Sequence, residues 1–211
     1  MTNPICPNCG SSLETMPHRK KKCPTCGQFI YVRTRLLDRE RILVTEKLAT
    51  KIDNERAILY KAKDAMRTFN ISDNEYSEAT KLLTEQFGTK PNHEDIIWSI
   101  LNNRLISAIR NNDYQEMKMI YRDQAFFLYG EKRDHFKVLQ ESLKCELLNY
   151  KANGFVKEVE ILTSEGVSCD KCRLLGGKKF TIGEALEQMP IPVQDCEHGW
   201  CRCMYLPVVN L

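Results

Sequence analysis

The sequence predicts a mainly α-helical protein with a small, cysteine-rich β module at each end. Four of the ten cysteines lie before residue 27 and five lie after residue 168, while Cys145 stands alone between the two groups. Glycine and proline are both absent from residues 28–87, and proline is absent from residues 92–189. This composition favours long helices in the middle of the chain. We therefore expect three parts, which comprise residues 1–35, 36–152 and 153–211.

Composition sets the broad class of the protein. The 211 residues are 42% hydrophobic and 28% charged, as in folded soluble proteins. No apolar run reaches the roughly 18 residues that a membrane span needs, and the first residues lack the features of a secretory signal. We expect a cytoplasmic protein, where cysteines serve more often as metal ligands than as disulfides.

The N-terminal cysteines form two copies of the motif C-P-x-C-G, at residues 6–10 and 23–27. In such a turn two thiolates face one ion, and the 13 residues between Cys9 and Cys23 can form a hairpin that brings both turns together. The β-branched and aromatic residues 28–32 predict a short strand. This pattern, over residues 4–33, resembles the zinc-ribbon family. It implies a Zn²⁺ site at Cys6, Cys9, Cys23 and Cys26, with rubredoxin-like iron as the rival metal.

The same module carries most of the positive charge. Residues 1–35 hold six Lys or Arg and one Glu, whereas the rest of the chain has no basic excess. A nucleic-acid interface would use phosphate contacts from Arg19, Lys20, Lys21, Lys22, Arg33 and Arg35. Phe29 or Tyr31 would stack on bases. The alternative is a solvated loop that keeps the module soluble.

The middle of the chain predicts five helices. Apolar side chains recur at helical spacing from Leu36 to Phe69, and this first helix could also form a dimeric coiled coil. Capping signals predict further helices from Ser72 to Phe87, after Pro91, from Asp113 to Gly130 and from Asp134 to about residue 151. We expect an antiparallel bundle or hairpins like those of tetratricopeptide repeats. His93 and His135 lie at expected helix starts and Cys145 is expected to be buried, so none predicts catalysis.

The C-terminal segment predicts a second metal module. In residues 156–162 apolar and charged side chains alternate, as in a half-buried strand. A second strand is expected before a short helix at 184–189. Residues 204–209 are expected to form a last strand. Cys169 and Cys172 are spaced to face one ion. On an extended segment Cys201 and Cys203 would point to opposite faces, so one of them is expected to bind. The expected ligands are Cys169, Cys172, Cys196 and Cys201, with Cys203 and His198 as substitutes.

Residues 155–209 resemble the C-terminal module of the Mu-type phage head-morphogenesis family, also described as minor head proteins. The matching features are Cys169 with Cys172, Gly177 with Phe180, and the ending H-x-x-C-R-C at residues 198–203. The resemblance implies phage or prophage ancestry and places His198 at a ligand position. The helix-like insertion at 182–189 and the extra Cys196 depart from the family pattern.

These features predict a non-enzymatic adaptor of phage-derived type that holds two Zn²⁺ ions and binds a protein partner through its helical middle. The chain lacks a recognisable nucleophile, general base or phosphate-binding loop. Nucleic-acid binding through the N-terminal module is the alternative. A zinc-dependent hydrolase is a weaker one, because it needs an open metal position beside a carboxylate such as Asp195 or Glu197.

Overall fold

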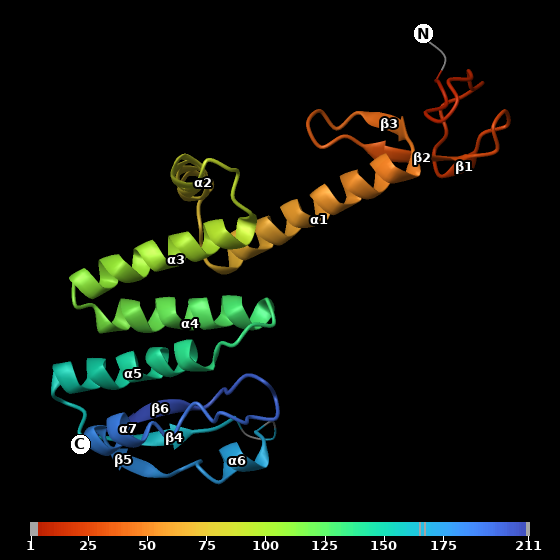
Figure 1. Ribbon diagram of the computed structural model, residues 1–211. Coiled ribbons are helices and arrows are strands. Elements are labelled where there is room, and N and C mark those ends of the chain that lie inside the picture. The colour runs from red at the N-terminus through yellow and green to blue at the C-terminus, as the bar shows by residue number, and fades with distance from the viewer. Residues whose placement is uncertain (1–3, 165, 167, 210–211) are drawn as a thin grey trace. The chain divides into compact units, whose positions relative to one another are not determined.

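The computed structural model describes residues 4–164, 166 and 168–209. The chain divides into two compact units, Met1–Ser72 and Asp73–Leu211, which are described separately. Within the described residues there are seven helices and two three-stranded sheets (Figure 1). The prediction of a mainly α protein with a small β module at each end is confirmed at this level.

The first unit contains one sheet and one long helix. Its elements are β1 (Lys21–Lys22), β2 (Phe29–Thr34), β3 (Arg41–Val44) and α1 (Glu46–Thr68). The strands are antiparallel in the order β1-β2-β3. The prediction that the helix begins at Leu36 is wrong, because Thr45 caps α1 by accepting a hydrogen bond from the backbone N–H of Leu48. Val44 belongs to the sheet, so β3 continues the N-terminal module past residue 35.

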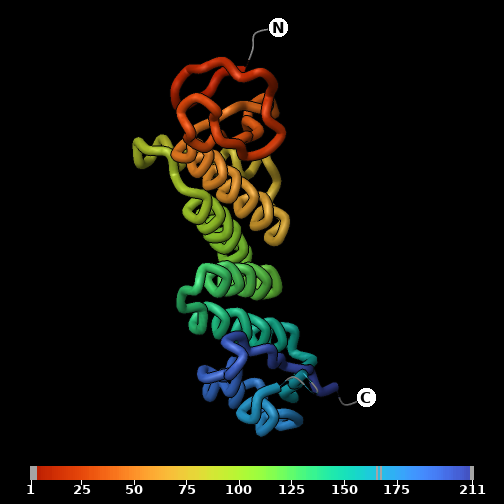
Figure 2. The backbone as a smooth tube through the Cα atoms, turned by 90° about the vertical axis from the view of Figure 1, so that its right-hand side faces the viewer, coloured from red at the N-terminus to blue at the C-terminus, as the bar shows by residue number. Residues whose placement is uncertain are grey.

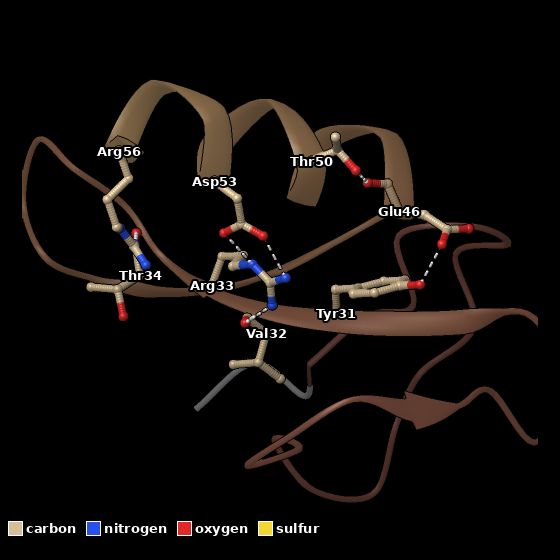
Figure 3. Close-up of polar contacts among 8 residues, drawn as sticks. All are labelled: Tyr31, Val32, Arg33, Thr34, Glu46, Thr50, Asp53 and Arg56. Carbon is tan, nitrogen blue, oxygen red and sulfur yellow. Dashed lines mark hydrogen bonds and ion pairs between the residues drawn. The ribbon is translucent and has the colours of Figure 1, made fainter. Parts of the chain in front are cut away.

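Helix α1 packs on the sheet through a small apolar cluster and two polar contacts. Tyr31 and Val44 are buried against Ala49 and Ile52 of the helix. Arg33 donates two hydrogen bonds to the Asp53 carboxylate, at 2.8 and 2.7 Å (Figure 3). Farther along the helix, Arg56 donates to the carbonyl oxygen of Thr34 at 2.7 Å. These contacts fix the helix along β2.

The second unit begins with four helices, as the sequence predicted. They are α2 (Asp73–Phe87), α3 (His93–Arg110), α4 (Tyr114–Gly130) and α5 (Phe136–Asn153). Asn92 caps α3, and Asp113 caps α4 by accepting a hydrogen bond from the Glu116 N–H. The predicted cap of α5 is displaced by one residue, because His135 holds the cap position while Asp134 accepts from the N–H of Phe136. Figures 1 and 2 show α3, α4 and α5 as successive layers.

The C-terminal module completes the second unit. It comprises β4 (Glu158–Leu162), α6 (Asp170–Arg173), β5 (Lys179–Thr181), α7 (Ile182–Gln188) and β6 (Met204–Val208). The strands pair antiparallel in the order β5-β4-β6. Thr181 caps α7 in a capping box with Glu184. The short helix therefore begins at Ile182, two residues before the start that the sequence predicted. The short helix α6, which the sequence did not predict, places Cys172 one turn after Cys169.

One hydrophobic core joins the helices to this module. Leu139, Leu143 and Leu147 of α5 are buried against Val159 and Ile161 of β4. The same core includes the buried cysteines 169, 172, 201 and 203. The helical part and the C-terminal module, which the sequence predicted to divide at residue 152, therefore share one hydrophobic core.

In the described part of the chain, none of the helices combines the length and the apolarity that crossing a lipid bilayer requires.

Candidate metal centres

The four N-terminal cysteines converge on one point. The Sγ atoms of Cys6, Cys9, Cys23 and Cys26 all lie within 4.8 Å of one another. The Cys6–Cys26 and Cys9–Cys23 sulfur distances are 4.0 and 3.8 Å. A tetrahedral metal with bonds of about 2.3 Å to sulfur separates its ligands by about 3.8 Å. The residues therefore fit one four-coordinate metal ion.

Two equivalent turns position these thiols. In each C-P-x-C-G motif the glycine N–H donates to the carbonyl oxygen of the first cysteine, at 2.9 Å for both Gly10 to Cys6 and Gly27 to Cys23. Both glycines have positive φ angles, 76° and 72°, which other residues adopt at a cost. The motif spacing thus translates directly into a pair of facing turns.

Hydrogen bonds prepare this cluster for a cation. The backbone N–H of Cys26 and the hydroxyl of Ser11 lower the pKa of Cys23 to about 5. Hydrogen bonds from Ser11 also lower the pKa of Cys9. A hydrogen bond from the Gln28 backbone lowers the pKa of Cys26, but burial and the neighbouring thiols outweigh it and raise that pKa to about 12. A metal ion binds cysteine in the thiolate form, so the lowered pKa values of Cys9 and Cys23 favour metal binding.

The C-terminal cysteines form two groups that share one residue. The Sγ atoms of Cys169, Cys172 and Cys196 lie within 4.8 Å of one another, and so do those of Cys172, Cys201 and Cys203. Cys196 Sγ is 3.9 Å from both Cys169 Sγ and Cys172 Sγ. All five thiols could therefore take part in metal binding. His198 Nδ1 is 3.9 Å from Cys196 Sγ, but His198 belongs to neither group.

The expectation that Cys201 and Cys203 point to opposite faces is wrong. Residues 201–203 are not part of a strand, because β6 begins at Met204. The period-two rule for extended chains therefore does not apply to them. Both side chains are buried and both approach Cys172.

Hydrogen bonds lower the pKa of two C-terminal thiols. The Cys203 thiol and the backbone N–H of Val193, which lies 3.3 Å from the sulfur, lower the pKa of Cys201 to about 5. A backbone hydrogen bond from Cys172 lowers the pKa of Cys169. Burial raises the pKa of Cys172 and Cys196, and the hydrogen bond with Cys201 raises that of Cys203. The pKa values of the clustered thiols are therefore shifted in opposite directions.

An aromatic cluster holds the C-terminal cysteine loop against the helices. The Trp200 ring stacks on His135 at 5.3 Å and also contacts Tyr129 at 5.5 Å and Phe126 at 5.8 Å. Gly199 has a φ of 68°, and a side chain there would lie 3.6 Å from the Tyr129 ring. The cysteine loop is thereby held against the end of α4 and against His135.

Half of the basic segment of the N-terminal module lies on a strand, and Arg19 and Lys20 precede it. β1 pairs Lys21 with Ile30 and Lys22 with Phe29. Lys20 Nζ lies 4.2 Å from the centre of the Phe29 ring, which is 42% exposed. Within residues 4–164, 166 and 168–209, no ion pair involves Arg19, Lys20, Lys21 or Lys22. This basic edge, defined as residues 19–22 with Phe29, keeps its positive charge uncompensated.

Three other residues expected at a nucleic-acid interface are engaged elsewhere. Tyr31 is buried and its hydroxyl donates to Glu46 at 2.7 Å. Arg33 is paired with Asp53, whose pKa is lowered by the hydrogen bonds from that guanidinium (Figure 3). Arg35 pairs with Asp38 and Glu40. The expectation that Tyr31 is a free stacking platform is wrong. Arg33 and Arg35 are both engaged in ion pairs within the first unit.

A third group of potential ligands lies at the start of α3. His93, Glu94 and Glu131 have ligand atoms within 4.8 Å of one another. The sequence indicated only a helix start here, since Glu131 is distant along the chain. Glu94 lies in the first turn of α3, where a carboxylate is favourable. The buried Nε2 atom of His93 has no hydrogen-bond partner among the described residues.

Comparison with protein-family models, with curated proteins and with solved structures found no match for this chain. The two cysteine centres and the basic edge are therefore the observations from which a function can be argued.

Proposed function

We propose that the protein is a non-enzymatic adaptor whose two ends are organised by Zn²⁺ bound to cysteine thiolates. The observation that supports this most directly is the small interior of the N-terminal module. Its buried cluster consists of Cys6, Leu13, Cys23 and Ile30, so half of it is thiol. So little apolar burial cannot stabilise a fold alone, and metal binding supplies the missing free energy.

The helical surface of the second unit is the proposed protein-binding region. A cavity of about 730 Å³ lies between α2 and α3, and its lining includes Phe87, Trp98 and Asn102. Phe87 is 65% exposed, and Asn102 is held by a hydrogen bond from the buried Gln124 side chain. A concave surface with apolar side chains and fixed amides is typical of sites that bind a partner segment.

Replacing Phe87 with glutamate is expected to abolish retention of the partner without unfolding the protein, since the side chain is mostly exposed. Proteins that wild-type adaptor retains from a host-cell lysate would be compared by mass spectrometry with those that the variant retains. Leu174→Glu, at a side chain that is 73% exposed in the C-terminal module, is the matched control. Identical sets of retained proteins for wild type and F87E would contradict the proposed surface.

The phage or prophage-derived type rests on the resemblance of residues 155–209 to the head-morphogenesis family. The structure adds that Cys169, Cys172, Cys201 and Cys203 are buried together. Phage structural genes flanking the coding sequence would support this part of the proposal. Their absence from all genomes that carry the gene would count against it.

Nucleic-acid binding by the first unit is the second candidate function. The observation that favours it is the charge of that unit: Met1–Ser72 contains 14 Lys or Arg and 7 Asp or Glu, whereas residues 73–211 are net acidic. The basic edge concentrates four of these cations beside an exposed aromatic ring. Such a surface suits phosphates with a stacked base.

Changing Lys20, Lys21 and Lys22 together to glutamine is expected to weaken binding to a fluorescent single strand and to flatten its salt dependence. Each lost phosphate contact reduces the slope of log affinity against log salt by about 0.7, so the slope falls by up to about 2. The control is the exposed triple change Lys132→Gln, Lys137→Gln and Lys151→Gln, which removes the same charge from the second unit. Equal slopes for both triple variants would exclude the basic edge as the interface.

A further inference from the structure

The two cysteine centres differ in their geometry. At the N-terminus one group contains all four thiols, with every pair of sulfur atoms within 4.8 Å. At the C-terminus the five thiols divide into two groups of three, and Cys172 belongs to both. The first arrangement surrounds one point in space, whereas the second surrounds two.

One tetrahedral ion does not account for the C-terminal arrangement. Such an ion requires four sulfur atoms with all six distances near about 3.8 Å. Among the described residues, no set of four C-terminal thiols has all of its sulfur atoms within 4.8 Å. Within a single group, however, the distances suit one ion, as the two separations of 3.9 Å from Cys196 show.

We infer that Cys172 bridges two metal ions in the C-terminal module. One ion is held by Cys169, Cys172 and Cys196, and the other by Cys172, Cys201 and Cys203. This inference rests on the proposed binding of Zn²⁺ by thiolates and adds a third ion to the chain. A thiolate sulfur has several lone pairs and can bind two soft or borderline cations at once.

The surroundings can complete and balance such a pair. His198 Nδ1 lies 3.9 Å from Cys196 Sγ, so a small movement of this exposed side chain supplies a fourth donor to the first ion. Cys201 and Cys203 line a cavity of about 440 Å³, where solvent can supply a donor to the second. Arg122 and Arg202 line the same cavity, as does Lys118, which is paired with Glu146. The two arginines offset the excess negative charge of five thiolates on two divalent ions.

Metal content tests the bridge directly. Wild-type protein purified with zinc is expected to carry about three ions per chain by mass spectrometry of the metal, one at the N-terminal site and two at the C-terminal pair. Cys203→Ser is expected to lose one ion, and Cys172→Ser is expected to lose two. Cys145→Ser is the matched control, because Cys145 is buried and belongs to neither centre.

Cadmium-113 NMR of the wild-type protein provides a readout that needs no variant to fold. Two C-terminal cadmium signals that are coupled to each other through one sulfur are expected. About two ions per chain, unchanged in C203S, together with uncoupled cadmium signals, would overturn the bridge and leave the two-zinc proposal standing. A folded protein without bound metal would instead overturn both.

Discussion

Replacing Cys23 with serine is expected to unfold the N-terminal β module while leaving the second unit folded. Cys23 is 2% exposed and is one of the four buried side chains in the cluster around the N-terminal cysteines. Structural zinc sites contribute about 10–16 kcal/mol of apparent binding free energy near neutral pH. Loss of one ligand removes much of this free energy, and the remaining core is too small to replace it.

Amide NMR spectra of wild type and C23S would measure this loss residue by residue. Signals from β1, β2 and β3 are expected to collapse to unfolded positions, while those of α4 and α5 persist. A strong chelator added to the wild type should also collapse the signals of β1, β2 and β3, and C145S should not. Retention of the β2 signals after complete metal removal would show that the module folds without an ion.

Replacing Leu147 with alanine is expected to destabilise the second unit by about 2–5 kcal/mol. Leu147 is 0% exposed and lies in the core that joins α5 to the C-terminal sheet. The truncation leaves a cavity that the surrounding strands cannot fill, because α5 is fixed on its other side by α4. The loss therefore combines transfer free energy with an unfilled void.

Urea unfolding, followed by helical circular dichroism in the presence of zinc, measures this change. Leu174→Ala is the matched control, because Leu174 is 73% exposed and a surface truncation changes stability by about 0.5 kcal/mol or less. Equal unfolding midpoints for L147A and L174A would mean that α5 and the C-terminal module do not share a core in solution.

Local signals made much of the fold predictable. The cap at Asp113 lies three residues before Glu116, whose backbone N–H it binds, so this helix start could be identified from neighbouring residues. The C-P-x-C-G turns are equally local, and the structure brings their four cysteines together. Where residues within one turn determine the conformation, their spacing in the sequence is sufficient to predict the structure.

Features that depend on distant contacts were missed. Leu37 and Val44 fit a helical spacing, but pairing with β2 places Val44 in a strand and the helix starts later. Tyr31 and Arg33 looked available for nucleic acid until α1 supplied Glu46 and Asp53 as partners. Cys201 and Cys203 converge because their segment is irregular, which no periodic pattern indicates.

The strand order of the C-terminal sheet has a consequence for biosynthesis. The central strand β4 is the first of the three to leave the ribosome, and its second neighbour β6 is the last. The N-terminal cysteines leave the ribosome much earlier. The module to which they belong is formed by one continuous segment of the chain. If the chain binds zinc as proposed, it can therefore load the first ion during translation, whereas the last centre must wait until residues 201–208 have been added.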